Sequence, residues 1–226
     1  MSVAPRARLA SIADLEIPRL IYALGAVIVV VALLGAVNAD VTRVPAFALQ
    51  GELRDVGFNA PVLFTGCLGL LSAALAVRCA SIEAGRGEPS WQWAILAGAF
   101  AFGAIDEMLT FHERIEQSVG VDFEVLYSPL LLVAIVAWFV ALRSFGNSPA
   151  GLLWIAGVVA WAVAQSIEAL TWGVHPFGAV TSSGVTVAND IEELLEMAGW
   201  TLFIWAMLLL GRERTAARSF PPPPRG

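Results

Sequence analysis

Six long apolar runs, separated by polar connections, are the feature that most limits how this chain can fold. Each run holds about 20 residues, the length that an α-helix needs to cross the hydrocarbon core of a bilayer. A helix also pairs its own backbone polar groups, which any segment inside a bilayer must do. The pattern therefore predicts an all-α integral membrane bundle of six transmembrane helices. The runs cover residues 18–37, 58–80, 91–111, 126–145, 151–172 and 191–210.

The composition agrees with a membrane location. The 226 residues are 58% hydrophobic and 14% charged, with a mean hydropathy of +0.75. Soluble domains carry about 25% charged residues, so the lipid bilayer is the expected partner of this chain. The net charge of −6 does not favour nucleic acid as a partner. Cys67 and Cys79 lie twelve positions apart, about 18 Å along one helix, which is too far for a disulfide.

The arginine positions predict the orientation. With six spans, the two termini and the second and fourth connections lie on one side of the membrane, and that side holds ten of the 13 basic residues. The opposite side holds Arg43, Arg54 and Arg114. The positive-inside rule then places both termini in the cytoplasm, with the inner (plasma) membrane as the expected location. The ten are Arg6, Arg8, Arg19, Arg78, Arg86, Arg143, Arg212, Arg214, Arg218 and Arg225.

Three segments divide the chain. Residues 1–17 are predicted to be a cytoplasmic N-terminal segment and residues 18–210 the transmembrane domain. Residues 211–226 end in a proline-rich stretch and are predicted to be a disordered cytoplasmic tail. A cleaved signal peptide is the alternative for the first run, because residues 37–39 resemble a cleavage site. The run exceeds the usual signal core of about 7–15 residues, which favours a retained helix.

Acidic side chains at one depth are the most informative motif. The third and fifth helices run outward and the sixth runs inward, so all three place carboxylates in the outer leaflet. An ionised group at membrane depth costs at least about 2.5–3.5 kcal/mol, and clustered carboxylates also repel one another. A divalent metal ion held between them would offset both costs, so a metal site is expected. Its predicted ligands are Asp106, Glu107, His112, Glu113, Glu168, Glu193 and Glu196.

The ligand pattern limits the candidate metals. Di-metal carboxylate proteins use Glu residues from several helices together with Glu-x-x-His pairs. This chain has two Glu-x-x-Glu pairs, which begin at Glu113 and Glu193, and one nearby histidine, so it departs from the usual two-histidine pattern. A di-iron pair and manganese are the leading candidates, and calcium and magnesium also suit oxygen ligands. An enzyme built on this site would use the metal to activate water or oxygen, as a hydrolase or oxidoreductase of an apolar substrate.

Other functions fit the same residues. A proton- or cation-coupled transporter would use the acids as a relay, although the inner halves of the three helices show no matching ionisable groups. An accessory subunit of a larger membrane complex would pair the acids with arginines of a membrane protein partner. Structural roles also compete: Asn189 and Glu192 fit a capping box that begins the last helix. Gln165 fits a hydrogen bond between helices.

Two acidic segments also resemble those of a group of uncharacterised bacterial multi-pass membrane proteins. That group carries Asp-Glu…His-Glu and Glu-Glu-x-x-Glu-Met segments, and here they fall on the third and sixth predicted helices, about a fifth of the chain. The resemblance implies a multi-pass membrane fold and brings no established activity with it. The matching residues are Asp106, Glu107, His112, Glu113, Glu192, Glu193, Glu196, Met197, Ala198 and Gly199.

Overall fold

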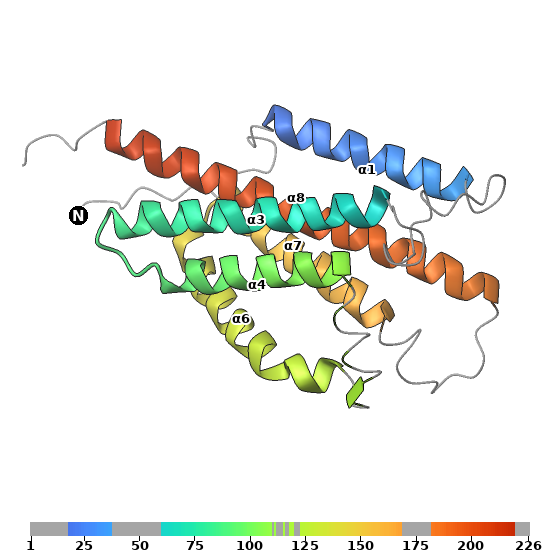
Figure 1. Ribbon diagram of the computed structural model, residues 1–226. Coiled ribbons are helices and arrows are strands. Elements are labelled where there is room, and N and C mark those ends of the chain that lie inside the picture. Colours follow the sequence, from blue (N-terminus) through green and yellow to red (C-terminus); the bar gives the residue numbers. More distant parts are fainter. Residues whose placement is uncertain are drawn as a thin grey trace, which may run out of the picture.

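The computed structural model describes residues 18–37, 60–109, 111, 115, 118–119, 123–168 and 182–219. Over these residues the chain forms six helices and no strands, which confirms the predicted all-α fold. Successive helices run in opposite directions through the bundle (Figure 1). They are α1 (Arg19–Val37), α3 (Ala60–Ala84), α4 (Trp91–Leu109), α6 (Phe123–Phe145), α7 (Pro149–Glu168) and α8 (Ser182–Ser219).

Two short turns reverse the chain at the same end of the bundle. Residues 85–90 join α3 to α4, and residues 146–148 join α6 to α7. Each turn contains a glycine of positive φ close to the end of the preceding helix. Gly87, after α3, has a φ of 73°, and Gly146, after α6, has a φ of 55°. Glycine adopts this left-handed conformation without the steric penalty of a Cβ atom, which is why it commonly ends helices. These two turns therefore fix which helix ends lie together.

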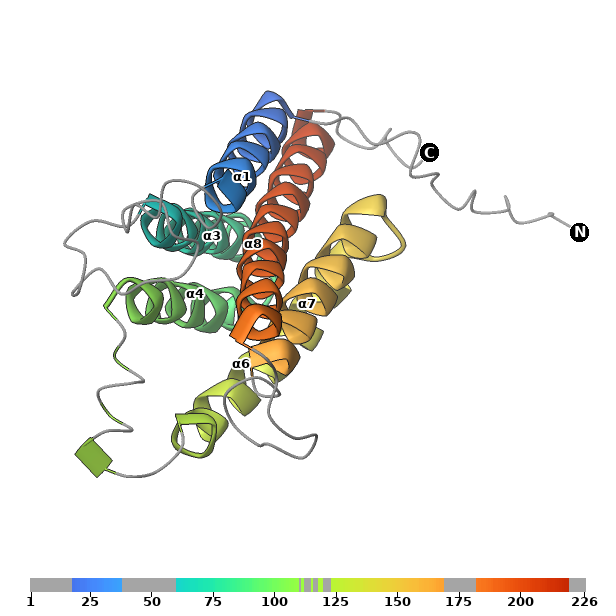
Figure 2. The same cartoon turned by 90° about the vertical axis from the view of Figure 1, so that its right-hand side faces the viewer.

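The long helix α8 is the central element of the bundle. It packs against α7, α3 and α1, while α4 packs against α3 and α6 (Figure 2). Aromatic rings fill the space between these helices: Trp154 is fully buried and lies 5.5 Å from Trp93 and 4.9 Å from Phe203, measured between ring centroids. Buried aromatic rings of this kind supply a large share of the packing energy of a core.

Glycines allow two pairs of helices to approach closely. A Cβ atom on Gly157 of α7 would lie 3.2 Å from the backbone oxygen of Gly199 on α8, and one on Gly199 would lie 3.1 Å from the oxygen of Gly157. On α3, a Cβ atom on Gly69 would lie 2.7 Å from that of Ala104 on α4. Small residues at such positions are typical of helix contacts in membranes. They bring α7 onto α8 and α3 onto α4.

Among the described residues, four helices are long and apolar enough to cross a membrane. Their spans are Pro61–Ala84, Val125–Phe145, Pro149–Ile167 and Asp190–Arg214. The apolar part of α1, Arg19–Leu33, is shorter. The helix α4 is not among these spans, and it carries Gln92, Asp106 and Glu107 in an otherwise apolar sequence.

Apolar side chains also cover the outside of the bundle. On α6, for example, Val125 is 63% exposed, Leu132 is 62% exposed and Phe139 is 58% exposed. On α1, Tyr22 and Leu33 are exposed to a similar degree. Contiguous apolar surface of this extent is rare on soluble monomers and is expected where helices face lipid. The exposed side chains therefore indicate contact with a bilayer.

Several helix ends differ from the predicted boundaries. The helix α8 begins at Ser182, so Asn189 lies inside it, and the interpretation of Asn189 as an N-cap is wrong. Residues 211–219, assigned by sequence to the C-terminal tail, are the last turns of α8. The helix α3 also extends past residue 80 to Ala84. The apolar pattern marks only the stretch that lipid can cover, whereas a helix with no proline to stop it continues into the polar sequence.

Candidate functional site

Two facing stripes of side chains connect α4 to α8. On α4, Phe100 and Glu107 lie seven residues apart and therefore share a face. The Phe100 ring lies 5.3 Å from that of Trp200 and 5.5 Å from that of Phe203, both on α8. Because the two helices are antiparallel (Figure 1), the face of α4 two turns beyond Phe100 meets the face of α8 two turns before Phe203. Glu107 is at that point on α4, and Glu196 is at that point on α8.

Three carboxyl groups meet at this point. Glu107 on α4 and Glu193 and Glu196 on α8 each offer an oxygen, and these oxygens all lie within 4.8 Å of one another. Glu193 and Glu196 are three residues apart, so one face of α8 presents both. Glu196 is 8% exposed, and the other two are half-buried. We call Glu107, Glu193 and Glu196 the carboxylate triad.

A third helix holds the triad from the side. The Gln165 side chain of α7 donates a hydrogen bond from Nε2 to Oε1 of Glu196, with a distance of 2.8 Å. The predicted interhelical hydrogen bond of Gln165 is thus confirmed, and its acceptor is a member of the triad. The Gln165 side chain can reach Glu196 because the contact between Gly157 and Gly199, two turns from Gln165, brings α7 close to α8. The triad and Gln165 therefore join α4, α7 and α8.

Electrostatic repulsion makes the triad costly without a cation or bound protons. Two ionised carboxylates 4.8 Å apart repel each other by about 3.5 kcal/mol at an effective dielectric constant of about 20. Three such pairs exceed the benefit of one charge-assisted hydrogen bond, which is about 1.5–3 kcal/mol. A positive charge among the three oxygens would attract all three carboxylates, and this attraction would outweigh their mutual repulsion.

The spacing of the oxygens also suits a metal ion. Two ligands of one ion can be separated by at most twice the metal–oxygen bond length. That limit is about 4.2 Å for magnesium and about 4.6–5.2 Å for calcium, so three oxygens that all lie within 4.8 Å of one another could bind one calcium-sized ion, and magnesium only where their separations are shorter than that bound. A metal bound there would supply a Lewis acid and could activate a coordinated water.

Asp106, next to Glu107, faces a different helix. Phe102, one turn before Asp106 on α4, contacts Tyr127 of α6 with a centroid distance of 5.2 Å. The Asp106 carboxylate is close enough to influence the Tyr127 hydroxyl electrostatically. Adjacent residues on a helix point about 100° apart, since 3.6 residues complete one turn. Asp106 therefore lies beside the triad, on the side of α4 that packs on α6.

Three of the predicted ligands have no described side chain. His112 and Glu113 lie outside the described residues, and Glu168 is the last residue of α7, with a side chain that is not described. Sequence reasoning also missed Tyr127. One signal was present: the chain has only two tyrosines, and this one begins a predicted span at the depth of the acids.

The described chain is thus a helical bundle of membrane-compatible helices with a carboxylate cluster that could hold a metal ion. It belongs to a family defined as a domain of unknown function, DUF8692, whose model matches residues 21–211. That match includes all three members of the triad and Gln165. No curated protein and no solved structure matches the chain.

Proposed function

We propose that this chain is an integral membrane protein with six transmembrane helices and both termini in the cytoplasm. The four membrane-compatible helices support this proposal, and so does the alternating direction of all six (Figure 1). Contacts between described residues support it further, because the ends of α3, α6 and α8 meet at one end of the bundle. These are the ends that the arginine count assigns to the cytoplasmic side.

We further propose that the protein binds a divalent metal ion in the outer leaflet of the inner membrane. The observation that carries this proposal is the meeting of Glu107 with Glu193 and Glu196 inside an apolar bundle. Gln165 orients Glu196 as a hydrogen-bond partner outside the ligand set, a role that such groups commonly play around metals. The remaining predicted ligands would complete the coordination of this ion or bind a second one; they are Asp106, His112, Glu113 and Glu168. The candidate metals are manganese and a di-iron pair.

The proposed activity is that of a metal-dependent oxidoreductase or hydrolase. The triad lies between helices whose outer faces are apolar, so an apolar substrate could reach it from the lipid. Tyr127 and Asp106, beside the triad on the α6 side, are the described polar groups available for proton exchange with such a substrate. Here the metal would activate water or oxygen.

Elemental analysis of detergent-purified protein tests the metal proposal. We expect about one or two divalent ions per chain in the wild type, and their loss in the double variant Glu193→Gln, Glu196→Gln. The matched control is Glu192→Gln, which removes a neighbouring charge on the same helix and leaves the triad intact. Absence of stoichiometric metal from the wild type, or its retention in the double variant, would show that the triad is not a metal site.

A proton- or cation-coupled transporter is the second candidate. One observation favours it: Glu83 is a buried carboxyl group in the last turn of α3, whereas Glu107 of the triad lies near the end of α4, the next helix, which runs in the opposite direction (Figure 1). Ionisable groups are therefore present at both ends, although this one lies on α3 and not on the three helices whose inner halves lack them. Ion flux into proteoliposomes distinguishes the two functions. Flux that depends on both Glu83 and Glu196 would favour the transporter, and metal without flux would favour the enzyme.

A further inference from the structure

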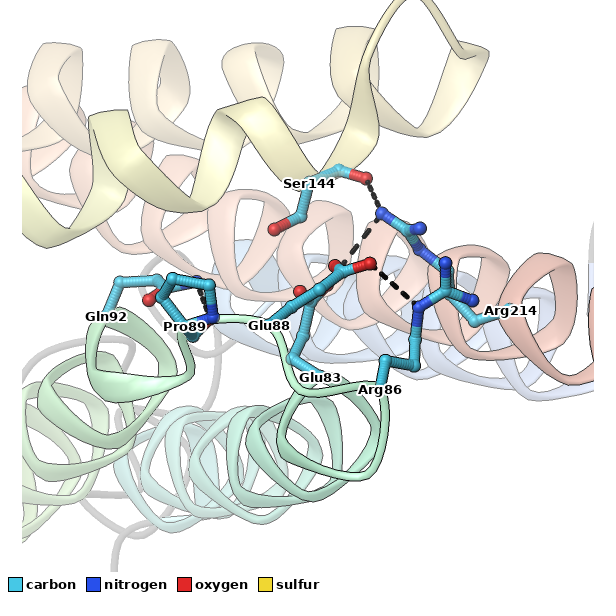
Figure 3. Close-up of polar contacts among 7 residues, drawn as sticks. All are labelled: Glu83, Arg86, Glu88, Pro89, Gln92, Ser144 and Arg214. Carbon is cyan, nitrogen blue, oxygen red and sulfur yellow. Dashed lines mark hydrogen bonds and ion pairs between the residues drawn. The ribbon is translucent and has the colours of Figure 1, made fainter.

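A network of charged side chains ties three helices together at the end of the bundle opposite the triad (Figure 3). Arg214 of α8 donates a hydrogen bond to the backbone oxygen of Ser144 at the end of α6, at 2.8 Å. The same guanidinium lies 3.8 Å from Oε1 of Glu83 on α3. In the turn that follows α3, Arg86 donates to Oε1 of Glu88 at 3.0 Å. The turn folds back on α3, because the backbone N–H of Glu88 bonds to the oxygen of Glu83 at 3.1 Å.

Glu83 is the buried member of this network. It is 3% exposed, and its Oε1 atom accepts no hydrogen bond. A carboxylate so placed would leave much of its charge unsolvated, which a folded protein avoids by pairing or protonation. The ion pair with Arg214 is long at 3.8 Å, and Arg214 gives its short hydrogen bond to the Ser144 carbonyl instead. Arg214 alone therefore compensates Glu83 poorly.

The second carboxyl group identifies the missing partner. The side chains of Glu83 and Glu88 lie within hydrogen-bonding distance of each other. Two carboxylates cannot bond to each other, because both are acceptors; the contact requires a proton on one of them. Glu88 also accepts from Arg86, and an ionised Glu88 is the better acceptor for that cation. The proton therefore belongs on Glu83.

We propose that Glu83 and Glu88 form a proton-binding site, in which a single proton is shared between the two carboxyl groups and docks the α3–α4 turn onto the ends of α8 and α6. With the proton in place, Glu83 donates to Glu88, Glu88 pairs with Arg86, and Arg214 is left to bind Ser144. Without it, two carboxylates face each other and the turn is repelled from α3. This site is separate from the triad and does not depend on metal binding.

Titratable and polar groups of the packed elements surround Glu83. On α3, Cys79 lies one turn away and is buried, and Arg78 precedes it. The Arg214 guanidinium of α8 and the Ser144 hydroxyl of α6 both face the Glu83 carboxyl group and stabilise its charge. The nearest described polar residue of α4 is Gln92, whose amide donates to the backbone oxygen of Pro89 at 2.9 Å and carries no charge. Glu88 is thus the described carboxyl group that a protonated Glu83 would face.

Infrared spectroscopy of the full chain tests the shared proton directly. At neutral pH we expect the C=O stretch of a protonated carboxylic acid, which disappears in Glu83→Gln. Glu193→Gln is the control, because it alters the triad and should leave this band in place. Absence of any band that Glu83→Gln removes would overturn the proposal.

Thermal unfolding in detergent supplies the second test. Gln at position 83 keeps a donor for Glu88, so it mimics the protonated acid. We expect Glu83→Gln to match the wild-type Tm at neutral pH and to keep that Tm at alkaline pH, where the wild type loses the shared proton and unfolds earlier. If Glu83 is instead the ionised partner of Arg214, Glu83→Gln will lower the Tm or fail to fold at neutral pH, and that result refutes the proposal.

Discussion

Gln165 on α7 donates a 2.8 Å hydrogen bond to Glu196 on α8, 31 residues further along the chain. The bond engages one oxygen of Glu196 and orients the second. If the triad holds a metal, Gln165 is a positioning residue, because its amide acts on the metal only through the carboxylate that it holds. Residues in this role commonly affect metal affinity strongly.

We expect Gln165→Leu to weaken metal binding by about 10- to 100-fold, the usual effect of losing a partner of a ligand. Isothermal titration of metal-stripped protein with manganese measures the change. The control is Gln92→Leu, which removes a different glutamine, one that is buried and bonds to Pro89 near the opposite end of the bundle. Equal losses in both variants would mean that the effect is general destabilisation.

The contact between Gly157 and Gly199 predicts a sensitive position. In Gly157→Ala, the new Cβ atom would lie 2.8 Å from the Phe203 ring and 3.2 Å from the Gly199 oxygen. Overpacking of this kind typically costs about 1–3 kcal/mol of unfolding free energy. Denaturant unfolding in detergent measures the change. Gly98→Ala is the matched control: nothing lies within 4 Å of its Cβ position, so the better helix propensity of alanine should stabilise α4 by up to about 1 kcal/mol.

Glu88 contributes to how the stability of the fold changes with pH on the acidic side. Hydrogen bonds with the Glu83 carboxyl and with the Arg86 guanidinium lower the pKa of Glu88 below its ordinary value. A lowered pKa in the folded state stabilises the fold above the ordinary glutamate pKa of about 4.3, and the contribution is lost as the pH falls through the lowered value. We therefore expect the Tm difference between wild type and Glu88→Gln to be present at neutral pH and to vanish in acid.

A double-mutant cycle checks the cause of that difference. Arg86→Gln removes the partner of Glu88 and leaves its carboxyl group in place. The coupling between the two substitutions should be small, as for other exposed ion pairs, and should disappear with the same pH dependence. A difference that persists in acid would mean that Glu88 acts through its shape and not through its charge.

Cysteine labelling tests the proposed orientation. In a background without Cys67 and Cys79, we expect Gly85→Cys and Asn147→Cys to resist a membrane-impermeant maleimide in intact cells and to react after the membrane is opened. Val119→Cys should react from outside. All three positions are exposed in the described structure. The reverse pattern, or the same pattern at all three positions, would contradict an even number of spans with cytoplasmic termini.

The fold could be predicted from the sequence because lipid imposes one simple rule on it. A run of about 20 apolar residues has almost no alternative to a helix in a membrane. This rule does not predict where a helix ends. The helix α8 accordingly extends about nine residues beyond the predicted run at each end. Glu83 was missed for this reason: it lies in the last turn of α3, past the point where the apolar pattern stops.

The triad could be predicted in part. Equal depth on antiparallel helices brought Glu107 together with Glu193 and Glu196, and depth follows from the sequence. Which face of a helix meets which neighbour does not follow from depth. Asp106 has the same depth as Glu107, yet the packing of α4 on α6 directs it to Tyr127. Rotation about the helix axis is set by contacts such as those of Phe100, which no local pattern reveals.

The unbroken course of α8 has a consequence for how a metal would arrive. Its 38 residues measure about 57 Å at 1.5 Å per residue, nearly twice the bilayer core of about 30 Å. In the proposed orientation, with Arg212 at the inner headgroups, Glu196 stands about 24 Å away, just beneath the outer boundary. The turns of α8 that precede Glu196 would then extend beyond the bilayer into the external water. An ion would then be loaded from the periplasmic side, directly from that compartment and without passage through the cytoplasm.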